Sequence, residues 1–183
     1  SIVGKDKSFF KNIRINAVND FHDDNLYIES CASKIRTTQQ RIGKPDKLLF
    51  SFHGIPQSYI CEDEPYQSQC LVTASLIAKK LTLDESQYEV AFQSRFGKAE
   101  WIKPYLSSRL EELPKEGIHN IHVFCPGFSS DCLETIDEIG RESKEEFFEH
   151  GGKTFEFIPC LNSEETFINA LMDIQKKADI KIL

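Results

Sequence analysis

Four glutamates recur at every fourth position in the second half of the chain: Glu134, Glu138, Glu142 and Glu146. On an α-helix, like charges at this spacing each cost roughly 0.2–0.5 kcal/mol, so we expect a function that offsets the repulsion. At about 1.5 Å per residue, Glu134 to Glu142 would form a file of carboxylates about 12 Å long, along which a divalent cation could pass. A solvated acidic face, with Arg141 and Lys144 nearby, is the alternative interpretation.

His53 is the second candidate for chemistry. It follows an apolar run and precedes Gly54 and Pro56, so a short, rigid connection holds an imidazole that titrates near neutral pH. With Glu134 it could accept or shuttle protons on two sides of a flat ligand, or bind a metal through nitrogen and oxygen donors. A structural histidine is the alternative. With a single histidine in reach, we expect a metal in transit and no permanent zinc site.

Two further side chains suit a flat, acidic ligand. Arg95 could pair with ligand carboxylates in bidentate fashion, although a surface ion pair is the alternative. Trp101, the only tryptophan, could stack on an aromatic ligand, although core packing is the commoner role. Neither a GxGxxG fingerprint nor a P-loop is present, so the sequence does not support phosphate binding.

The elements that must position these residues alternate along the chain. Apolar runs predict strands at 47–52, 88–93, 118–124 and 154–158. Helices are predicted from a cap at Asp23 or Asp24 to Gly43, over 66–81, over 101–113 with Pro104 in the first turn, over 131–150, and from about 163. The alternation predicts an α/β fold, a four-stranded parallel sheet flanked by helices in a Rossmann-like, doubly wound arrangement.

In such a sheet, the segments that follow the strands open on the same edge. We therefore expect one pocket to collect the candidate residues: His53, Ser94, Arg95, Trp101, Asp131 and Glu134.

Composition narrows the class of partner. The 183 residues are 40% hydrophobic and 28% charged, with a net charge of −7 and no dense basic run, so nucleic acid is not an expected partner. No apolar run is long enough to span a bilayer and no cleavable signal pattern is visible, so we expect a cytoplasmic protein. The six cysteines show no CxxC pair, which favours reduced thiols.

Three sequence blocks, in order, resemble the ferrochelatases, which insert ferrous iron into protoporphyrin IX in the last step of haem synthesis. They are LFSFHGIP (49–56), FQSRFG (92–97) with Trp101 following, and CPGFSSDCLET (125–135). The resemblance extends from about Asn12 to the C-terminal region. It implies a chelatase-type domain and a π-type widening of the acidic helix.

By position, the resemblance implies that His53 and Glu134 are catalytic and bind metal, and that Glu138 and Glu142 continue the metal path. It places Ser94, Arg95, Trp101 and Asp131 at the porphyrin. Iron would be a substrate and no permanent cofactor is expected. No iron–sulfur cluster is expected either, because nothing after Cys160 supplies the ligands that some relatives have. Cys132 stands where many relatives have histidine, which bears on metal preference.

The family has two similar α/β domains with the porphyrin between them, and this chain resembles the second. We expect an N-terminal segment with a crossing helix at 1–45 and the C-terminal chelatase domain at 46–183, with the family's N-terminal domain absent from this chain. The expected partners are protoporphyrin IX, ferrous iron and, for collecting a greasy substrate, a peripheral membrane surface; no oligomeric state is assigned.

Two alternatives stay open. One is a related chelatase that loads cobalt or iron into a carboxylate-rich ring of the sirohydrochlorin type, for which Arg95, Lys98 and Lys103 supply few basic groups. The other is a non-catalytic fragment that binds metal or tetrapyrrole.

Overall fold

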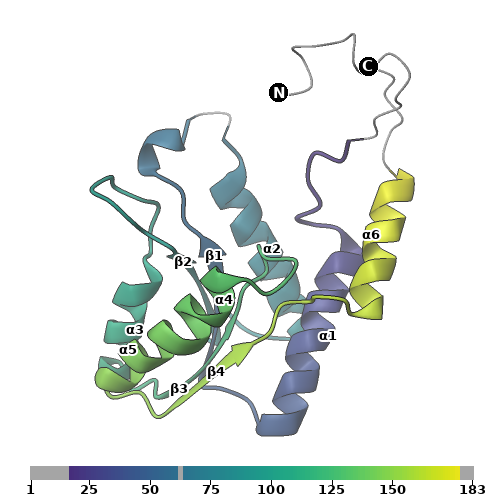
Figure 1. Cartoon of the computed structure of the whole chain (residues 1–183). Helices are drawn as coiled ribbons and strands as arrows, with labels where there is room; N and C mark the ends of the chain where they lie inside the picture. The colour runs from purple at the N-terminus through teal and green to yellow at the C-terminus, as the bar shows by residue number, and fades with distance from the viewer. Residues whose placement is uncertain (1–16, 62–63, 178–183) are drawn as a thin grey trace.

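A parallel sheet lies between two layers of helices in the computed structural model, which describes residues 17–61 and 64–177 (Figure 1). Within these residues the strands are β1 (Lys47–His53), β2 (Tyr88–Gln93), β3 (Asn120–Phe124) and β4 (Thr154–Ile158). All pairs are parallel and the order is β2-β1-β3-β4. The predicted α/β fold class and all four predicted strands are confirmed.

Helices cover both faces of the sheet (Figure 1). One face packs against α1 (Asn25–Ile42), α2 (Tyr66–Leu81) and α6 (Glu165–Lys177). The other packs against α3 (Leu106–Lys115) and the acidic segment, which consists of α4 (Leu133–Ile136), η3 (Glu138–Ser143) and α5 (Lys144–Glu149). A short 3-10 turn, η2 (Gln57–Tyr59), follows β1. Side chains alternate along each strand, so every strand contributes to both cores.

The first helix starts at the cap that its sequence predicts. The Asp24 carboxylate accepts hydrogen bonds from the backbone N–H groups of Leu26 and Tyr27, at 2.9 and 3.1 Å, and so satisfies two of the free donors at the helix start. The buried face of α1 lies in the same core as β1, α2 and α6. The α1 helix of the predicted N-terminal segment therefore packs against the segment predicted as a separate domain at 46–183, and residues 1–16 lie outside the described part.

One predicted helix starts late. The sequence predicts a helix over 101–113, but α3 begins at Leu106, and Pro104 precedes it. Residues 101–105 are not helical because their backbone pairs with neighbouring segments: Phe92 N donates to Pro104 O at 2.8 Å, and Ile102 N donates to Ile55 O at 3.0 Å. Local proline preference favoured a first turn, and these tertiary backbone hydrogen bonds override it.

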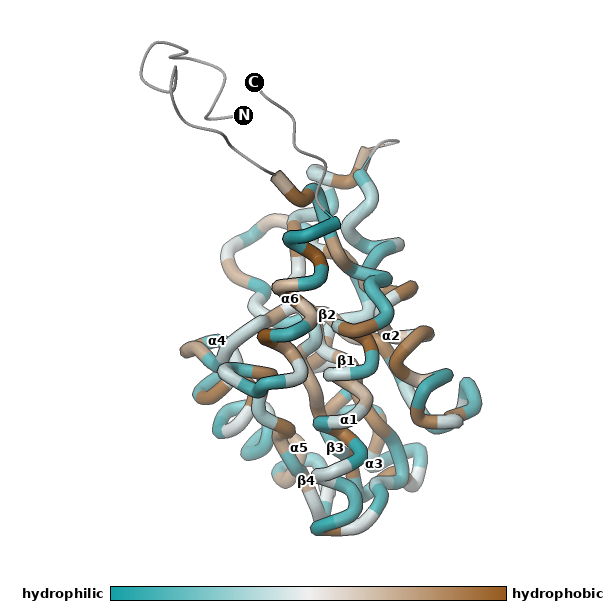
Figure 2. Tube along the Cα trace, turned by 90° about the vertical axis from the view of Figure 1, so that its right-hand side faces the viewer, coloured by the Kyte–Doolittle hydropathy of each residue, from teal (hydrophilic) through white to brown (hydrophobic). Residues whose placement is uncertain are grey.

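The helices carry mixed hydropathy along their length, as the alternating brown and teal segments of α2 illustrate (Figure 2). That pattern suits elements with one face on the core and one in water. Among the described residues, no helix is both long enough and apolar enough to cross a membrane.

Candidate functional site at the carboxyl edge of the sheet

The last residue of β1, His53, is half-buried and keeps one ring nitrogen for chemistry. Its Nδ1 lies 2.6 Å from the carbonyl oxygen of Gly54. A carbonyl only accepts, so Nδ1 carries the proton and donates it. In the neutral ring, Nε2 therefore holds a free lone pair, which suits it to take up a proton or bind a metal.

Gly54 lets the chain turn away directly behind this imidazole. Its N–H donates to Gln93 O at 2.9 Å. A Cβ on Gly54 would lie 3.0 Å from that same oxygen and 3.2 Å from Cε3 of Trp101, so a larger residue would push β1 and β2 apart. The glycine that follows His53 is thus required by close packing against Gln93 and Trp101.

The acidic segment contains the π-type widening that the resemblance implied. Glu142 N donates to Asp137 O, five residues back, at 2.9 Å, and Arg141 N donates to the same oxygen at 3.1 Å. The helix predicted over 131–150 is therefore a single helical run over 133–149, which is α-helical at both ends and π-helical at Glu138–Ser143. Bonding from i to i+5 puts more residues in each turn, so glutamates four apart lie closer to a single line than in an α-helix.

Segments that follow β1, β2 and β3 meet in one pocket of about 400 Å³ at the carboxyl edge of the sheet. It brings together six of the residues that the sequence singled out: His53, Ser94, Arg95, Glu134, Glu138 and Glu142. Asp137 adds a fourth carboxylate to its lining, while Phe96 and Leu133, 72% and 73% exposed, add apolar surface. The pocket thus combines an imidazole, a line of carboxylates and two apolar side chains.

Glu134 and His53 line this pocket from different segments of the chain. The pKa of the Glu134 carboxyl lies below its usual range because its own backbone N–H and the Cys132 side chain stabilise the anion, and His53 adds to the effect. Glu134 is exposed, so water screens these contributions. Glu134 therefore presents an ionised carboxylate to the pocket that the His53 imidazole also lines.

Glu138 differs from its neighbours because both of its oxygens are engaged. One accepts from Ser94 N and the other from Ser94 Oγ, each at 2.6 Å, and Gln93 Nε2 lies 3.5 Å from the second oxygen. Charge-assisted bonds of this length hold both partners firmly. Glu138 faces the pocket, but its first role in this structure is to tie η3 to the end of β2.

The sequence model of the ferrochelatase family matches residues 4–179. This chain belongs to the ferrochelatase family. It is 45% identical over 157 residues to the ferrochelatase of Janthinobacterium sp. (strain Marseille), a match that covers 86% of this chain and 43% of that protein. The ferrochelatases of Teredinibacter turnerae and Methylobacillus flagellatus are each 46% identical, over 154 and 160 residues.

The chain spans less than half the length of these curated relatives, 42% and 46% of the latter two. Among solved structures, a CbiX protein from Marinobacter aquaeolei, described as acting in cobalamin biosynthesis, aligns with a TM-score of 0.49 and 14% identity over 73% of this chain and 96% of its own. That likeness is too weak to support an argument about function. The assignment to the ferrochelatases rests on the sequence matches.

A second, smaller cavity of about 190 Å³ continues the line of acids within this ferrochelatase-family domain. Glu138, Glu142 and Glu146 line it together with Arg95 and Tyr105. Burial raises the pKa of the Glu146 carboxyl, in contrast to the exposed acids nearer His53. The Arg95 guanidinium lies 4.4 Å from the centre of the Tyr105 ring, a cation–π contact that orients it.

Trp101 is not on the pocket lining that the family resemblance implied. It is only 5% exposed, and its Nε1 donates to Phe96 O at 3.1 Å. The Phe96 ring lies 5.0 Å from the indole, and His53 packs 6.4 Å from it between ring centres. Trp101 is therefore a buried residue that packs against Phe96 and His53, two residues of the pocket lining. Phe96, which follows Arg95 in the same loop, presents the exposed aromatic surface.

Asp131 is also absent from the pocket lining. Its carboxylate accepts from Cys160 N at 2.9 Å and from Asn162 Nδ2 at 2.7 Å, on the side of the loop after β4. Burial raises the pKa of this carboxyl, but the Asn162 and Cys160 donors outweigh that effect and the pKa lies below its usual range. Only two residues separate Asp131 from Glu134 in sequence, yet the intervening turn directs the two carboxylates to different surroundings.

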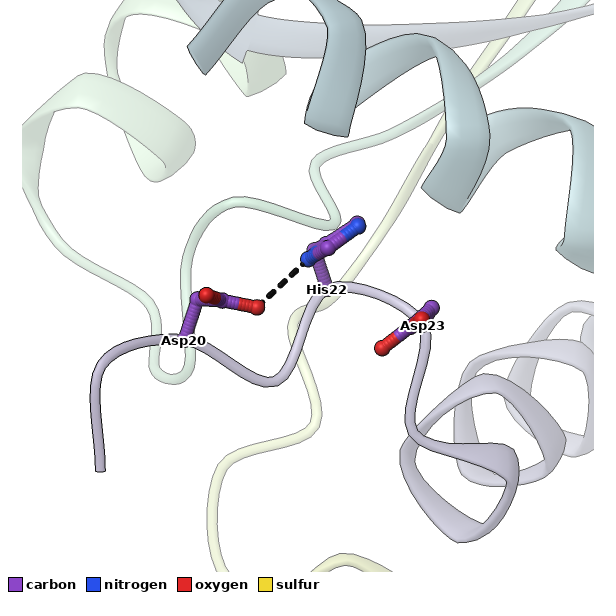
Figure 3. A group of neighbouring side chains, drawn as sticks. All are labelled: Asp20, His22 and Asp23. Carbon is purple, nitrogen blue, oxygen red and sulfur yellow. Dashed lines mark hydrogen bonds and ion pairs between the residues drawn. The ribbon is translucent and has the colours of Figure 1, made fainter. Parts of the chain in front are cut away.

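A separate group of side chains of the kind that bind metals lies just before α1. Oxygen or nitrogen atoms of Asp20, His22 and Asp23 all lie within 4.8 Å of one another. Figure 3 shows Asp20 directed at the His22 ring, whose Nδ1 lies 2.6 Å from the carboxylate. The contact between Asp20 and His22 explains why these two side chains lie together, and no further feature of the described residues at this place indicates a bound ion.

Proposed function

We propose that this chain carries the metal-inserting site of a ferrochelatase, which places ferrous iron in protoporphyrin IX and forms protohaem. The observation that supports it best is the convergence of His53 and Glu134 on one pocket in a chain of this family. Because the chain spans under half of its relatives, the proposal concerns the residues present and the steps that they perform.

Insertion of a divalent ion releases two pyrrole protons, so the site needs proton acceptors beside the ring. His53 Nε2 is available as a proton acceptor, because the Nδ1 proton is held by Gly54 O. Glu134, ionised and exposed, offers the second acceptor from another element. The two groups lie on different segments that border the same space, as a flat substrate requires.

The incoming iron would follow the carboxylates. Glu134 and Glu142 face the pocket without the double clamp that holds Glu138, and oxygen and imidazole donors suit a ferrous ion. Glu142 also borders the adjoining cavity that Glu146 lines, so the acids extend from that side towards His53. Ferrous iron is a substrate in this scheme, and we expect no permanent cofactor.

The pocket favours a ring with few carboxylates. Of its four acids, Asp137 and Glu142 pair with Arg141, so Glu134 and Glu138 remain, beside the Arg95 guanidinium, to repel a carboxylate-rich ring of the sirohydrochlorin type. Phe96 and Leu133 supply apolar contact area for protoporphyrin. We place this reaction in the cytoplasm, with protoporphyrin IX and ferrous iron as partners and a peripheral membrane surface as the source of the porphyrin.

Zinc insertion into protoporphyrin IX, followed by fluorescence, tests the proposal without iron oxidation. The chain should form zinc protoporphyrin, and His53→Ala and Glu134→Gln should each lower the rate by roughly 100-fold or more, as loss of a proton acceptor does. His150→Ala is the matched control, because that histidine is exposed at the end of α5 and should leave the rate unchanged.

Near-normal insertion by His53→Ala would contradict the proposed role of the imidazole. Tight porphyrin binding by the wild-type chain without any zinc insertion would instead favour the non-catalytic, tetrapyrrole-binding alternative.

A further inference from the structure

Gln93 is a buried polar residue that the proposed chemistry does not use. It ends β2, is 3% exposed, and pairs in register with His53 across the β1–β2 ladder. Its side chain bonds groups from several other elements. Buried polar groups whose hydrogen bonds are all made specify a single local arrangement, so the partners of this amide show which segments it holds in place.

The orientation of the amide follows from its partners. On one side, 2.6 Å away, is the backbone carbonyl oxygen of Glu134, which can only accept, so the Gln93 nitrogen must face it. The amide oxygen then accepts from Ser51 Oγ at 2.7 Å and from Cys125 Sγ at 3.5 Å. A flipped amide would set its oxygen against the Glu134 carbonyl oxygen, so that carbonyl fixes the orientation.

The element that receives this bond is the first turn of a longer helical run. α4 leads directly into the π-type segment η3, so the backbone hydrogen-bonding pattern changes just after this turn. Leu133 and Ile136 of this turn are 73% and 60% exposed, so burial of those side chains does not hold it. Buried Thr135 anchors its start, where Cys132 N donates to Thr135 Oγ1 at 2.9 Å, and Gln93 bonds the turn from the sheet side.

We propose that Gln93 is a positioning residue: its amide fixes the Glu134 turn to the end of β2 and thereby sets the Glu134 carboxylate opposite His53. The backbone of Gln93 pairs with His53 on β1, and its side-chain amide bonds the backbone of Glu134. Gln93 therefore sets the distance between the His53 imidazole and the Glu134 carboxylate. The weaker contact to Glu138 places the start of η3 on the same support. This inference rests on the proposed function of the pocket.

Three variants separate positioning from mere packing. Gln93→Leu removes the bonds at similar volume, Gln93→Glu keeps the shape and replaces the nitrogen by oxygen, and Gln40→Leu, on an exposed site of α1, is the control. In zinc insertion, Gln93→Leu should lower kcat/KM for the metal roughly 10- to 100-fold, as loss of groups that orient ligands does. Its KM for porphyrin should stay within about twofold of wild type, with Gln40→Leu unchanged in both.

The pH profile of Gln93→Glu gives a readout that a packing role would not move. When ionised, the introduced carboxyl repels the Glu134 carbonyl and the Glu138 carboxylate; when protonated, it donates as the amide does. The ratio of its activity to wild type should therefore rise as pH falls, while the ratio for Gln93→Leu stays flat. Equal, flat ratios for both variants, or unchanged metal kinetics in the folded variants, would overturn the proposal.

Hydrogen exchange tests the structural step without any activity. In Gln93→Leu, the Arg141 and Glu142 amides that bond Asp137 O should exchange at least about tenfold faster, whereas β1 amides keep their wild-type rates. Unchanged exchange over 133–143 would refute the positioning role even if activity fell. Failure of the wild-type chain to insert zinc would count against the proposed function, and the exchange result would still decide whether Gln93 holds the turn.

Discussion

Glu138 grips Ser94 with both carboxylate oxygens, one on the backbone N–H and one on the hydroxyl, each at 2.6 Å. Ser94 has a φ of 65°, in the left-handed region that a residue with a side chain rarely adopts. The two observations belong together, because two hydrogen bonds to one carboxylate can hold a residue in a backbone conformation that it would otherwise avoid. The loop that presents Arg95 and Phe96 therefore starts from a clamped residue.

The hydrogen bonds between Glu138 and Ser94 predict that Glu138→Gln and Glu142→Gln will change the free energy of unfolding by different amounts. Glu138→Gln should lower the free energy of unfolding by about 1–2 kcal/mol, since one charged acceptor is replaced by an amide nitrogen that cannot accept from Ser94. Glu142→Gln should change it by less than about 0.5 kcal/mol, because Glu142 is exposed and its ion pair with Arg141, at 3.0 Å, lies in water. Urea unfolding of both variants measures this; equal stabilities would mean that the clamp contributes nothing.

Ser94 itself allows the strain and the hydrogen bond to be separated. Ser94→Ala loses the hydroxyl bond and keeps the positive φ, whereas Ser94→Gly loses the same bond and relieves the strain. We expect the glycine variant to be the more stable of the two by roughly 0.5–1 kcal/mol, after the greater freedom of glycine in the unfolded chain is included. Thermal unfolding gives the comparison, and an alanine variant at least as stable would show that Ser94 is not strained.

The strands that position this site could be predicted from the sequence, because they depend on local residue patterns. Apolar runs mark the strands, turn residues bound them, and parallel topology then requires the segments after β1, β2 and β3 to share an edge. His53 and Glu134 could be assigned to one pocket on that basis alone. The π-type widening came from family resemblance, since no residue pattern in the segment distinguishes it from an α-helix.

The parts that could not be predicted depend on contacts between distant residues. Nothing near Trp101 in sequence shows that Phe96 lies over it, or that the backbone of 101–105 pairs beside Phe92. The engagement of Glu138 by Ser94 joins residues 44 positions apart. Gln93 gives no signal of its own, because a glutamine at a strand end has a role only once its burial is known.

His122 predicts a pH dependence of stability that is independent of the pocket. It is 2% exposed in β3, and its Nδ1 lacks a hydrogen-bond partner among the described residues. Burial lowers its pKa from 6.5 to about 4. Between these values the unfolded chain binds more protons than the folded chain, so stability is full above about pH 6.5 and is lost as pH falls towards 4.

Over that window the loss attributable to His122 should reach up to about 3 kcal/mol, at about 1.4 kcal/mol per unit of pKa difference. His122→Leu should flatten this part of the stability profile and cost little at pH 7, because the unpaired nitrogen is removed as well. Urea unfolding from pH 7.5 to 4.5 measures the slope. His150→Leu, at an exposed site, should keep the wild-type slope, and a leucine variant at position 122 with that same slope would refute the assignment.

Phe96 and Trp101 should affect the protein in opposite ways if the proposed function holds. Phe96 is 72% exposed, so Phe96→Ala should leave the free energy of unfolding within about 0.5 kcal/mol of wild type while weakening porphyrin binding several-fold, because apolar contact with the ring is lost. Trp101 is 5% exposed behind it, so Trp101→Leu should destabilise the fold by about 2–4 kcal/mol. Porphyrin titration by absorbance, paired with urea unfolding, measures both quantities. Unchanged porphyrin affinity in Phe96→Ala would remove this aromatic ring from the substrate surface and return Trp101 to consideration as the stacking residue.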